Sequence, residues 1–358
     1  MNTEIKEGLE GVVAFRTEIA EPDREGGALR YRGVDIEELV GKVPFEQVWG
    51  LLVDEALEPG MPVAEEVEPV AHTGQPMLDL QASLAHLAGT WGLKYSIDVG
   101  VEQLREDVAR LSAATLSLVA QIARGGDRPA VPKSEVDQGQ NAAERFLLQW
   151  RGELDERAGT AIDAYFASAA EHGLNASTFT ARVVISTGAG AGEALSAAVG
   201  ALSGPLHGGA PTRVLRMLDE VANTDTEQYV KGLLDRGERL MGFGHRVYRA
   251  EDPRARVLRR TAKELGSPRF EAAEELEQVA LAELRERHPE RVLATNVEFW
   301  SAVVLDVAGV PHELFPSMFA CSRTAGWSAH ILEQKRLSKL VRPSAQYVGP
   351  GARSLAEV

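Results

Sequence analysis

This 358-residue chain has a single cysteine, no net positive charge and few long apolar runs. Because Cys321 is the only cysteine, no internal disulfide can form, which favours a reducing compartment and predicts a small buried apolar role for this residue. The formal net charge is −15 at pH 7, and a field of this sign repels nucleic acid and anionic membranes. We therefore expect neither of them as a partner.

Signatures of membrane spans, nucleotides and metals are missing as well. Residues 183–206 could cross a bilayer by length, but Gly, Ala and Ser dominate them and Glu193 lies among them, so buried helices of a soluble core are expected. The GAGAGE sequence in this stretch lacks the third glycine of a dinucleotide fingerprint. There is no P-loop, HExxH or cysteine pair, and no basic region followed by an apolar one opens the chain. We expect a cytoplasmic protein without metal or cofactor.

The remaining composition is that of a globular protein whose segments are mostly helical. Hydrophobic residues make up 44% of the chain, whose length suffices for two domains. Apolar residues recur at three- and four-residue spacing in 142–150, 158–170 and 270–287, which predicts helices. Short β-branched runs in 11–39, separated by turn residues, predict a small hairpin, and 125–140 predicts an exposed loop. An all-α fold with a small N-terminal β-hairpin is therefore expected.

A basic island interrupts this acidic chain between residues 242 and 263. It holds seven basic residues against two acidic ones. Asp252 and Pro253 predict the start of a helix, so Arg254 and Arg256 fall in its first turn, where cations oppose the helix dipole at a cost of about 0.3 to 1 kcal/mol. Guanidinium groups at a helix N-terminus suit carboxylates or phosphates. The alternative is a solvated basic face.

Two histidines lie in glycine-rich loops that precede helices. His207 is in GPLHGGAP, where Pro211 predicts the first residue of a helix, and a histidine near a helix N-terminus can stay neutral and donate a hydrogen bond to an oxyanion. His245 follows Gly242-Phe243-Gly244, where the two glycines let a ligand approach the backbone closely. Each histidine alone is more often structural, but the pair in matching contexts indicates an active site.

A third motif, TNVEFW, contains Glu298. Thr295 and Glu298 have the spacing of a capping box, so a purely structural role for Glu298 is open. Downstream, Arg323 and Arg342 are unremarkable as single residues. The other histidines considered, which have no partners at metal-ligand spacing, are His72, His86, His288 and His312.

In order along almost the whole chain, these motifs resemble the citrate synthase family. The matching segments are TEIAEPDREGGALRYRGVDIEEL, AEHGLNASTFTAR, GPLHGGAP, MGFGHRVYRAEDPRAR, NVEFWSAVVLD, FACSRTAGWSAHILEQ and RPSAQYVGP. The resemblance implies an all-α homodimer with a large domain, 1–210 and 321–358, and a small mobile domain, 211–320. Because no added N-terminal regulatory domain is apparent, a simple dimer is expected.

The resemblance also implies an acyltransferase that condenses acetyl-CoA with oxaloacetate and water to citrate and CoA, the first step of the tricarboxylic acid cycle. Glu298 would remove the methyl proton, His207 would hydrogen-bond the thioester oxygen, and His245 would polarise the oxaloacetate carbonyl. The implied oxaloacetate residues are His172, Asn175, Arg254, Arg323 and Arg342, the last from across a dimer interface. The implied CoA residues are Met241, Gly242, Phe243, Gly244 and Arg246.

One residue departs from the family pattern, which usually has aspartate where this chain has Glu298. An extra methylene moves the carboxylate by about 1.5 Å, and a misplacement near 1 Å can cost about a hundredfold in rate. The nearest alternative is a 2-methylcitrate synthase that uses propionyl-CoA, since one methylene is worth only about 1 to 3 kcal/mol of discrimination. A more remote alternative is a non-catalytic acyl-CoA or citrate sensor in which Glu298 only caps a helix.

Overall fold

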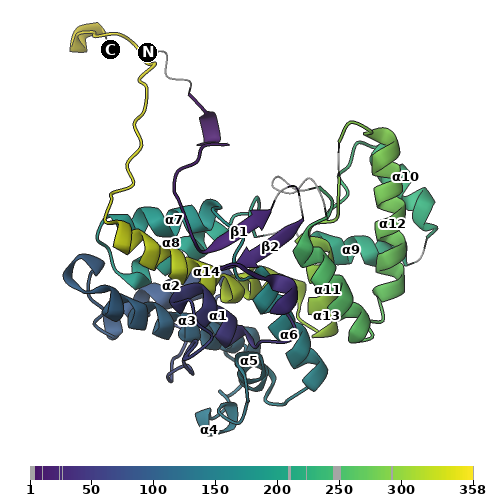
Figure 1. The fold of residues 1–358 in the computed structure, drawn as a ribbon, viewed down its shortest axis with the longest axis horizontal. Coiled ribbons are helices and arrows are strands. Elements are labelled where there is room, and N and C mark those ends of the chain that lie inside the picture. Colours follow the sequence, from purple (N-terminus) through teal and green to yellow (C-terminus); the bar gives the residue numbers. More distant parts are fainter. Residues whose placement is uncertain are drawn as a thin grey trace.

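The computed structural model describes residues 5–9, 11–23, 25, 27–208, 211–222, 224–244, 251–291 and 293–357. Helices dominate these ranges, which confirms the all-α class (Figure 1). The α-helices are α1 (Phe45–Asp54), α2 (Pro76–Thr90), α3 (Val101–Arg124), α4 (Lys133–Val136), α5 (Ala142–Arg151), α6 (Glu156–Ala169), α7 (Ala176–Ser186), α8 (Ala191–Leu202), α9 (Pro211–Val221), α10 (Thr226–Asp235), α11 (Pro253–Glu264), α12 (Phe270–Arg287), α13 (Val297–Val307) and α14 (Phe315–Leu337). The short 3₁₀ helices are η1 (Glu7–Leu9), η2 (Ile36–Glu38), η3 (Ser96–Asp98), η4 (His312–Leu314) and η5 (Leu355–Glu357).

The N-terminal region forms a small antiparallel sheet. Its strands β1 (Ala20–Asp23), β2 (Ala28–Tyr31) and β3 (Val34–Asp35) lie in the order β1-β2-β3, and Ala20 pairs with Tyr31. The predicted hairpin is therefore confirmed, and a third short strand extends it. This strand leads directly into η2.

Helix α14 is the centre of the larger group of helices. It is buried on almost every side, with α1, α3, α6, α7 and α8 packed around it (Figure 1). Small residues let these neighbours approach closely, and a helix buried all round needs no polar face. Two of its hydroxyls donate to backbone carbonyls, Ser322 to Phe166 at 2.5 Å and Thr324 to Cys321 at 2.7 Å. Cys321 is fully buried in α14, as the sequence predicts.

The glycine- and alanine-rich stretch 183–206 spans the end of α7 and all of α8, whose inward faces are buried. A side chain at Gly192 would place its Cβ 2.2 Å from that of Ala88, so this glycine permits the contact between α8 and α2. The prediction of buried helices is confirmed. Within the described ranges, no helix is long and apolar enough to cross a membrane.

Helices α9 to α13 lie together at one side of this body (Figure 1). Helices α11 and α13 pack against each other and against α6 of the larger group. The predicted division into 1–210 with 321–358 and 211–320 remains a prediction. What matters for the site is that the N-termini of α11 and α13 face the region where α6, α7 and α14 meet.

Candidate active site

A cavity of about 170 Å³ lies between the two groups of helices. Six of the residues that the sequence singles out line it, although they are far apart along the chain: His172, Asn175, His207, Arg254, Glu298 and Arg323. The other lining residues are Tyr165, Ala169, Gly208, Asn296, Val297, Ser301 and Phe319. A further cavity of about 80 Å³, between residues 61–68 and α5, contains none of the candidate residues.

Arg254 reaches the cavity from the first turn of α11 and is held there by Asp252. The Asp252 carboxylate accepts hydrogen bonds from the Arg254 backbone N–H (3.0 Å), Nε (3.0 Å) and Nη2 (2.8 Å), and both side chains are buried. Asp252 is thus the N-cap of α11 that the sequence predicts, and it also offsets the cost of a cation in the first turn. Its second oxygen accepts the N–H of Val297 at 3.1 Å, which joins the N-termini of α11 and α13.

Arg323 enters from the opposite wall on α14. It is 2% exposed, its Nε donates to the carbonyl of Ala169 at 3.1 Å, and its guanidinium carbon lies 4.6 Å from the ring centre of Phe319. Burial lowers the pKa of Arg323. Because the usual pKa of an arginine is very high, the group still remains a cation. A buried cation against an aromatic face is poised to bind an anion in the cavity.

His207 lies in a turn between α8 and α9 in which the Gly204 carbonyl accepts its backbone N–H at 2.9 Å. Burial, followed by the nearby charge of Arg323, lowers the pKa of His207 to about 4. The imidazole is therefore neutral at pH 7, as expected from the sequence. The physical cause is different, however, because burial and Arg323 dominate and not the helix N-terminus.

Ser177 holds the His207 ring in place and is a residue that the sequence reasoning missed. Its Oγ lies 2.9 Å from Nε2 of His207, accepts the indole N–H of Trp327 at 3.1 Å, and lies 2.9 Å from Oδ1 of Asn175. The single hydroxyl proton is donated to the Asn175 oxygen, so the oxygen of Ser177 is the atom that faces the His207 ring. These contacts fix the position of Ser177 and, with it, the orientation of the His207 ring.

Glu298 has a different local role from the one its motif suggests. The N-cap of α13 is Asn296, whose side chain accepts the Glu298 backbone N–H at 3.0 Å, and not Thr295. The capping-box alternative is therefore wrong, and within the described residues no hydrogen bond engages the Glu298 carboxylate. Burial raises the pKa of Glu298 to about 7, while Arg254 lowers it and Asp252 raises it further. This carboxyl group faces the cavity with the affinity for protons of a general base.

The segment 241–244, expected to bind CoA, lies beside the start of α13 and does not line the cavity as the described residues define it. Gly242 has φ +86°, and a Cβ there would lie 2.8 Å from the Cβ of Phe299. This glycine is therefore needed for the contact with α13, whereas the sequence suggested only the approach of a ligand. His245 and Arg246 lie outside the described residues, so the structure does not place them.

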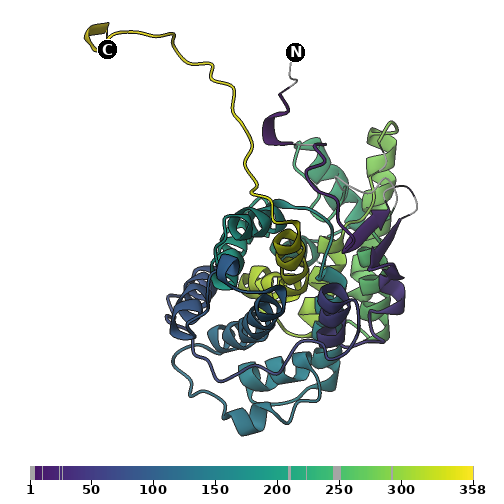
Figure 2. The ribbon, with the colours of Figure 1, turned by 60° about the vertical axis from the view of Figure 1, so that its left-hand side comes forward.

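Arg342 also does not line the cavity of its own chain. It lies in the exposed segment that follows α14 and extends away from the body of the molecule (Figure 2). Apolar side chains along this segment are exposed, with Tyr347 at 78% and Val348 at 86%.

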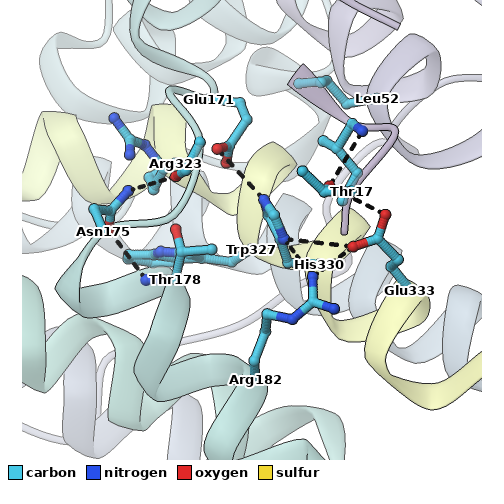
Figure 3. Close-up of polar contacts among 12 residues, drawn as sticks. Thr17, Leu52, Glu171, Asn175, Thr178, Arg182, Arg323, Trp327, His330 and Glu333 are labelled. Carbon is cyan, nitrogen blue, oxygen red and sulfur yellow. Dashed lines mark hydrogen bonds and ion pairs between the residues drawn. The ribbon is translucent and has the colours of Figure 1, made fainter. Parts of the chain in front are cut away.

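Behind the cavity, a row of buried charges joins α7 to α14 (Figure 3). Nη1 of Arg182 lies 2.8 Å from Nδ1 of His330 and 2.5 Å from the Glu333 carboxylate. Since arginine can only donate, Nδ1 of His330 accepts, and its Nε2 faces the Glu171 carboxylate at 3.4 Å. Glu171 directly precedes the cavity residue His172, so this row supports the cavity wall. Nothing in the sequence pattern distinguishes His330, because Arg182 is 148 residues away.

Among the residues that the structure describes, none forms a cluster of three or more His, Cys, Asp or Glu side chains that could hold a metal ion. The histidines outside the cavity include His72, His86 and His312, which are exposed. The cavity therefore offers cationic donors, one neutral histidine and one proton acceptor.

Comparison with known proteins shows which family the chain resembles. The family model described as "Citrate synthase, C-terminal domain" matches residues 8–344. The protein named "Putative citrate synthase 2" of Mycobacterium tuberculosis is 62% identical over 349 residues, 97% of this chain and 94% of that protein. The "Citrate synthase" of Haloferax volcanii is 35% identical over 98% of this chain and 97% of its own length.

The fold of this chain also matches that of solved citrate synthases. A solved citrate synthase from Thermoplasma acidophilum, in a ternary complex with carboxymethyl coenzyme A and oxaloacetate, superposes with a TM-score of 0.83, 25% identity and 99% coverage of both chains. With a family model over nearly its whole length and relatives above 30% identity along it, the chain belongs to the citrate synthase family of acyltransferases.

Proposed function

We propose that the protein is a citrate synthase that condenses acetyl-CoA with oxaloacetate and water to give citrate and free CoA. One observation carries the proposal: two buried arginines, a neutral histidine and a carboxyl group of raised pKa face the same cavity. Cationic donors suit a dicarboxylate, and a neutral donor beside a general base suits the formation of an enolate. The oxaloacetate in the Thermoplasma acidophilum complex supports this substrate.

Oxaloacetate would bind between the two walls of the cavity. Arg254 and Arg323 face it from α11 and α14, and each guanidinium would bind one carboxylate. His172 lines the same cavity, and Asn175 lies beside it with its side chain engaged as the N-cap of α7. Buried guanidinium groups bind carboxylates more strongly than exposed ones, because less water competes for them.

Glu298 would then remove a proton from the methyl group of acetyl-CoA. With a pKa of about 7, it is a stronger base than an ordinary glutamate and is still about half ionised at pH 7. The electrons of the broken C–H bond form the enolate, and neutral His207 donates a hydrogen bond to the enolate oxygen. Ser177 fixes the ring orientation that this hydrogen bond needs.

The enolate carbon attacks the keto carbon of oxaloacetate, and the keto oxygen takes up a proton. By resemblance to the family, His245 polarises this carbonyl. Water then cleaves the citryl thioester, which gives citrate and the CoA thiol. The segment 241–244 and Arg246 are the proposed contacts for CoA.

The proposed active unit is a homodimer. Arg342 lies in the segment that follows α14, which extends away from the helical body (Figure 2) and exposes apolar side chains. Arg342 would complete the oxaloacetate site of the partner copy. This arrangement explains why a candidate substrate residue lies outside the cavity that holds the other candidates.

Release of free CoA thiol tests the proposal. We expect release from acetyl-CoA only when oxaloacetate is present, with citrate as the product. Faster release from propionyl-CoA, with 2-methylcitrate as the product, would replace the proposal with the methylcitrate alternative. No release from either thioester, with binding intact, would indicate a sensor and overturn it.

A further inference from the structure

Glu37 connects the N-terminal sheet to α11, outside the cavity. Nε of Arg256 donates to Oε1 of Glu37 at 2.7 Å, and Nη1 of Arg260 lies 3.4 Å from Oε2. Burial opposes ionisation of Glu37, but the hydrogen bonds from both arginines outweigh it and hold the pKa of this carboxyl below its usual range. Arg256 also donates to the carbonyl of Gly27 at 3.3 Å. One carboxylate thus receives two cations of the same helix.

Glu37 itself is anchored to the larger group of helices. It lies in η2, which is capped by Asp35 and follows β3 directly. The sheet is fixed by Tyr31, whose hydroxyl donates to the carbonyl of Ser168 at 3.0 Å, and by Arg32, whose guanidinium donates twice to the carbonyl of Leu52. Glu37 is therefore a fixed point on the body formed by α1 and α6.

Helix α11, on the other side of this contact, contributes Arg254 to the cavity. Arg254 faces the cavity from its first turn, and Arg256 and Arg260 face Glu37. Because Asp252 also binds the N-terminus of α13, a displacement of α11 would displace Glu298 with it. The opposite wall, with His172 and Arg323, belongs to the larger group. The Glu37 contact therefore ties α11 to the body that carries the opposite wall.

We propose that Glu37 is a positioning residue that holds α11 where Arg254 and Glu298 face the opposite wall, so that binding of oxaloacetate depends on ionic strength. This inference rests on the proposed function for its substrate. The arginine and glutamate side chains of this contact are 33% to 44% exposed, so dissolved salt can screen the ion pairs. Direct packing of α11 on α6 keeps the helix in place when the pairs are weakened.

The test compares Glu37→Gln with Glu38→Gln. Glu38 is the matched control, because its carboxylate lies next to Glu37 but pairs with Lys42 on the surface. For Glu37→Gln we expect the KM for oxaloacetate to rise about three- to tenfold at low salt with kcat almost unchanged. In the wild-type protein and in Glu38→Gln, the same KM should rise more steeply with added NaCl than in Glu37→Gln, where only the attraction between the substrate and the cavity arginines is left to be screened.

A wild-type KM and salt dependence in Glu37→Gln would overturn the inference. Hydrogen exchange gives a second measurement that needs no turnover: amides of α11 should exchange about three- to tenfold faster in Glu37→Gln, with those of α3 unchanged. If the wild-type protein fails to release CoA, the proposed function is wrong, while hydrogen exchange still decides whether Glu37 holds α11. Unchanged exchange in α11 would show that it does not.

Discussion

At the scale of single residues, Glu298 combines burial with a raised pKa, and its ionisation should control activity. We expect kcat/KM for acetyl-CoA to fall about tenfold per pH unit below a pKa of about 7 and to level off above it, because only the carboxylate can remove the proton. Glu298→Gln should lose about 10²- to 10⁴-fold in kcat at neutral pH. Steady-state kinetics between pH 5 and 9 measure both, and near-normal turnover of Glu298→Gln would exclude this residue as the base.

The same residue should also affect stability. The folded-state pKa of Glu298 lies above its unfolded value of 4.5, so the folded form binds the proton more tightly, and the free energy of unfolding decreases as pH rises from about 4.5 to 7. Glu298→Gln removes this penalty and should be more stable than wild type above pH 7 by up to about 3 kcal/mol. Urea denaturation at pH 5 and pH 8 measures the difference, which should be small at pH 5. A loss of stability at pH 8 would contradict the assigned burial penalty.

Residues of the site differ in how far sequence could predict them. His172, Arg323 and Glu298 were predictable only through the family resemblance, since single residues without spacing signals carry no mechanism. The role of Ser177 could not be predicted, because its contact with His207 joins residues 30 positions apart and forms only in the folded chain. The neutral state of His207 was predictable, but its cause was not, because burial is a property of the packed cavity.

At the scale of elements, Asp252 joins two helices and one substrate residue. Asp252→Asn keeps the cap but removes the charge that pairs with Arg254, and breaking a buried pair costs about 3 to 5 kcal/mol. Because the Asp252 charge also raises the pKa of Glu298, the acidic limb of the kcat/KM profile should move to lower pH. Urea denaturation and the pH profile test the two effects.

Asp225→Asn is the matched control, since Asp225 caps α10 on the surface by accepting the Gln228 N–H at 2.8 Å. It should change neither stability nor the pH profile. An Asp252→Asn variant as stable as this control would show that the buried pair does not hold α11 and α13 together.

The predicted helix starts are correct where the sequence contains a single start signal. Asp252-Pro253 begins α11, and Pro211 begins α9, as predicted. For α13 the predicted cap, Thr295, is wrong. Thr295 and Asn296 are both residue types that cap helices well, and the contact of the Asn296 side chain with the Gly244 carbonyl favours Asn296. The third strand is only two residues long, too short for a periodic pattern.

At the scale of the whole molecule, the position of Arg342 predicts active sites shared between two copies. Glu298→Gln and Arg342→Ala variants should each be nearly inactive. Mixed in equal amounts and allowed to exchange subunits, they should recover about one quarter of wild-type activity, because each mixed dimer has one intact site. No recovery, with exchange verified by differently tagged subunits, would show that Arg342 does not act in a partner copy.

The most direct measurement of the central claim uses acetyl-CoA whose methyl group carries three deuterons. With oxaloacetate, the wild-type protein should form citrate with two deuterons in its new methylene group, since Glu298 removes one, and Glu298→Gln should form it at least about a hundredfold more slowly. Mass spectrometry of the product follows both. Absence of dideuterated citrate, or its formation at the wild-type rate by Glu298→Gln, would contradict the proposed chemistry of this cavity.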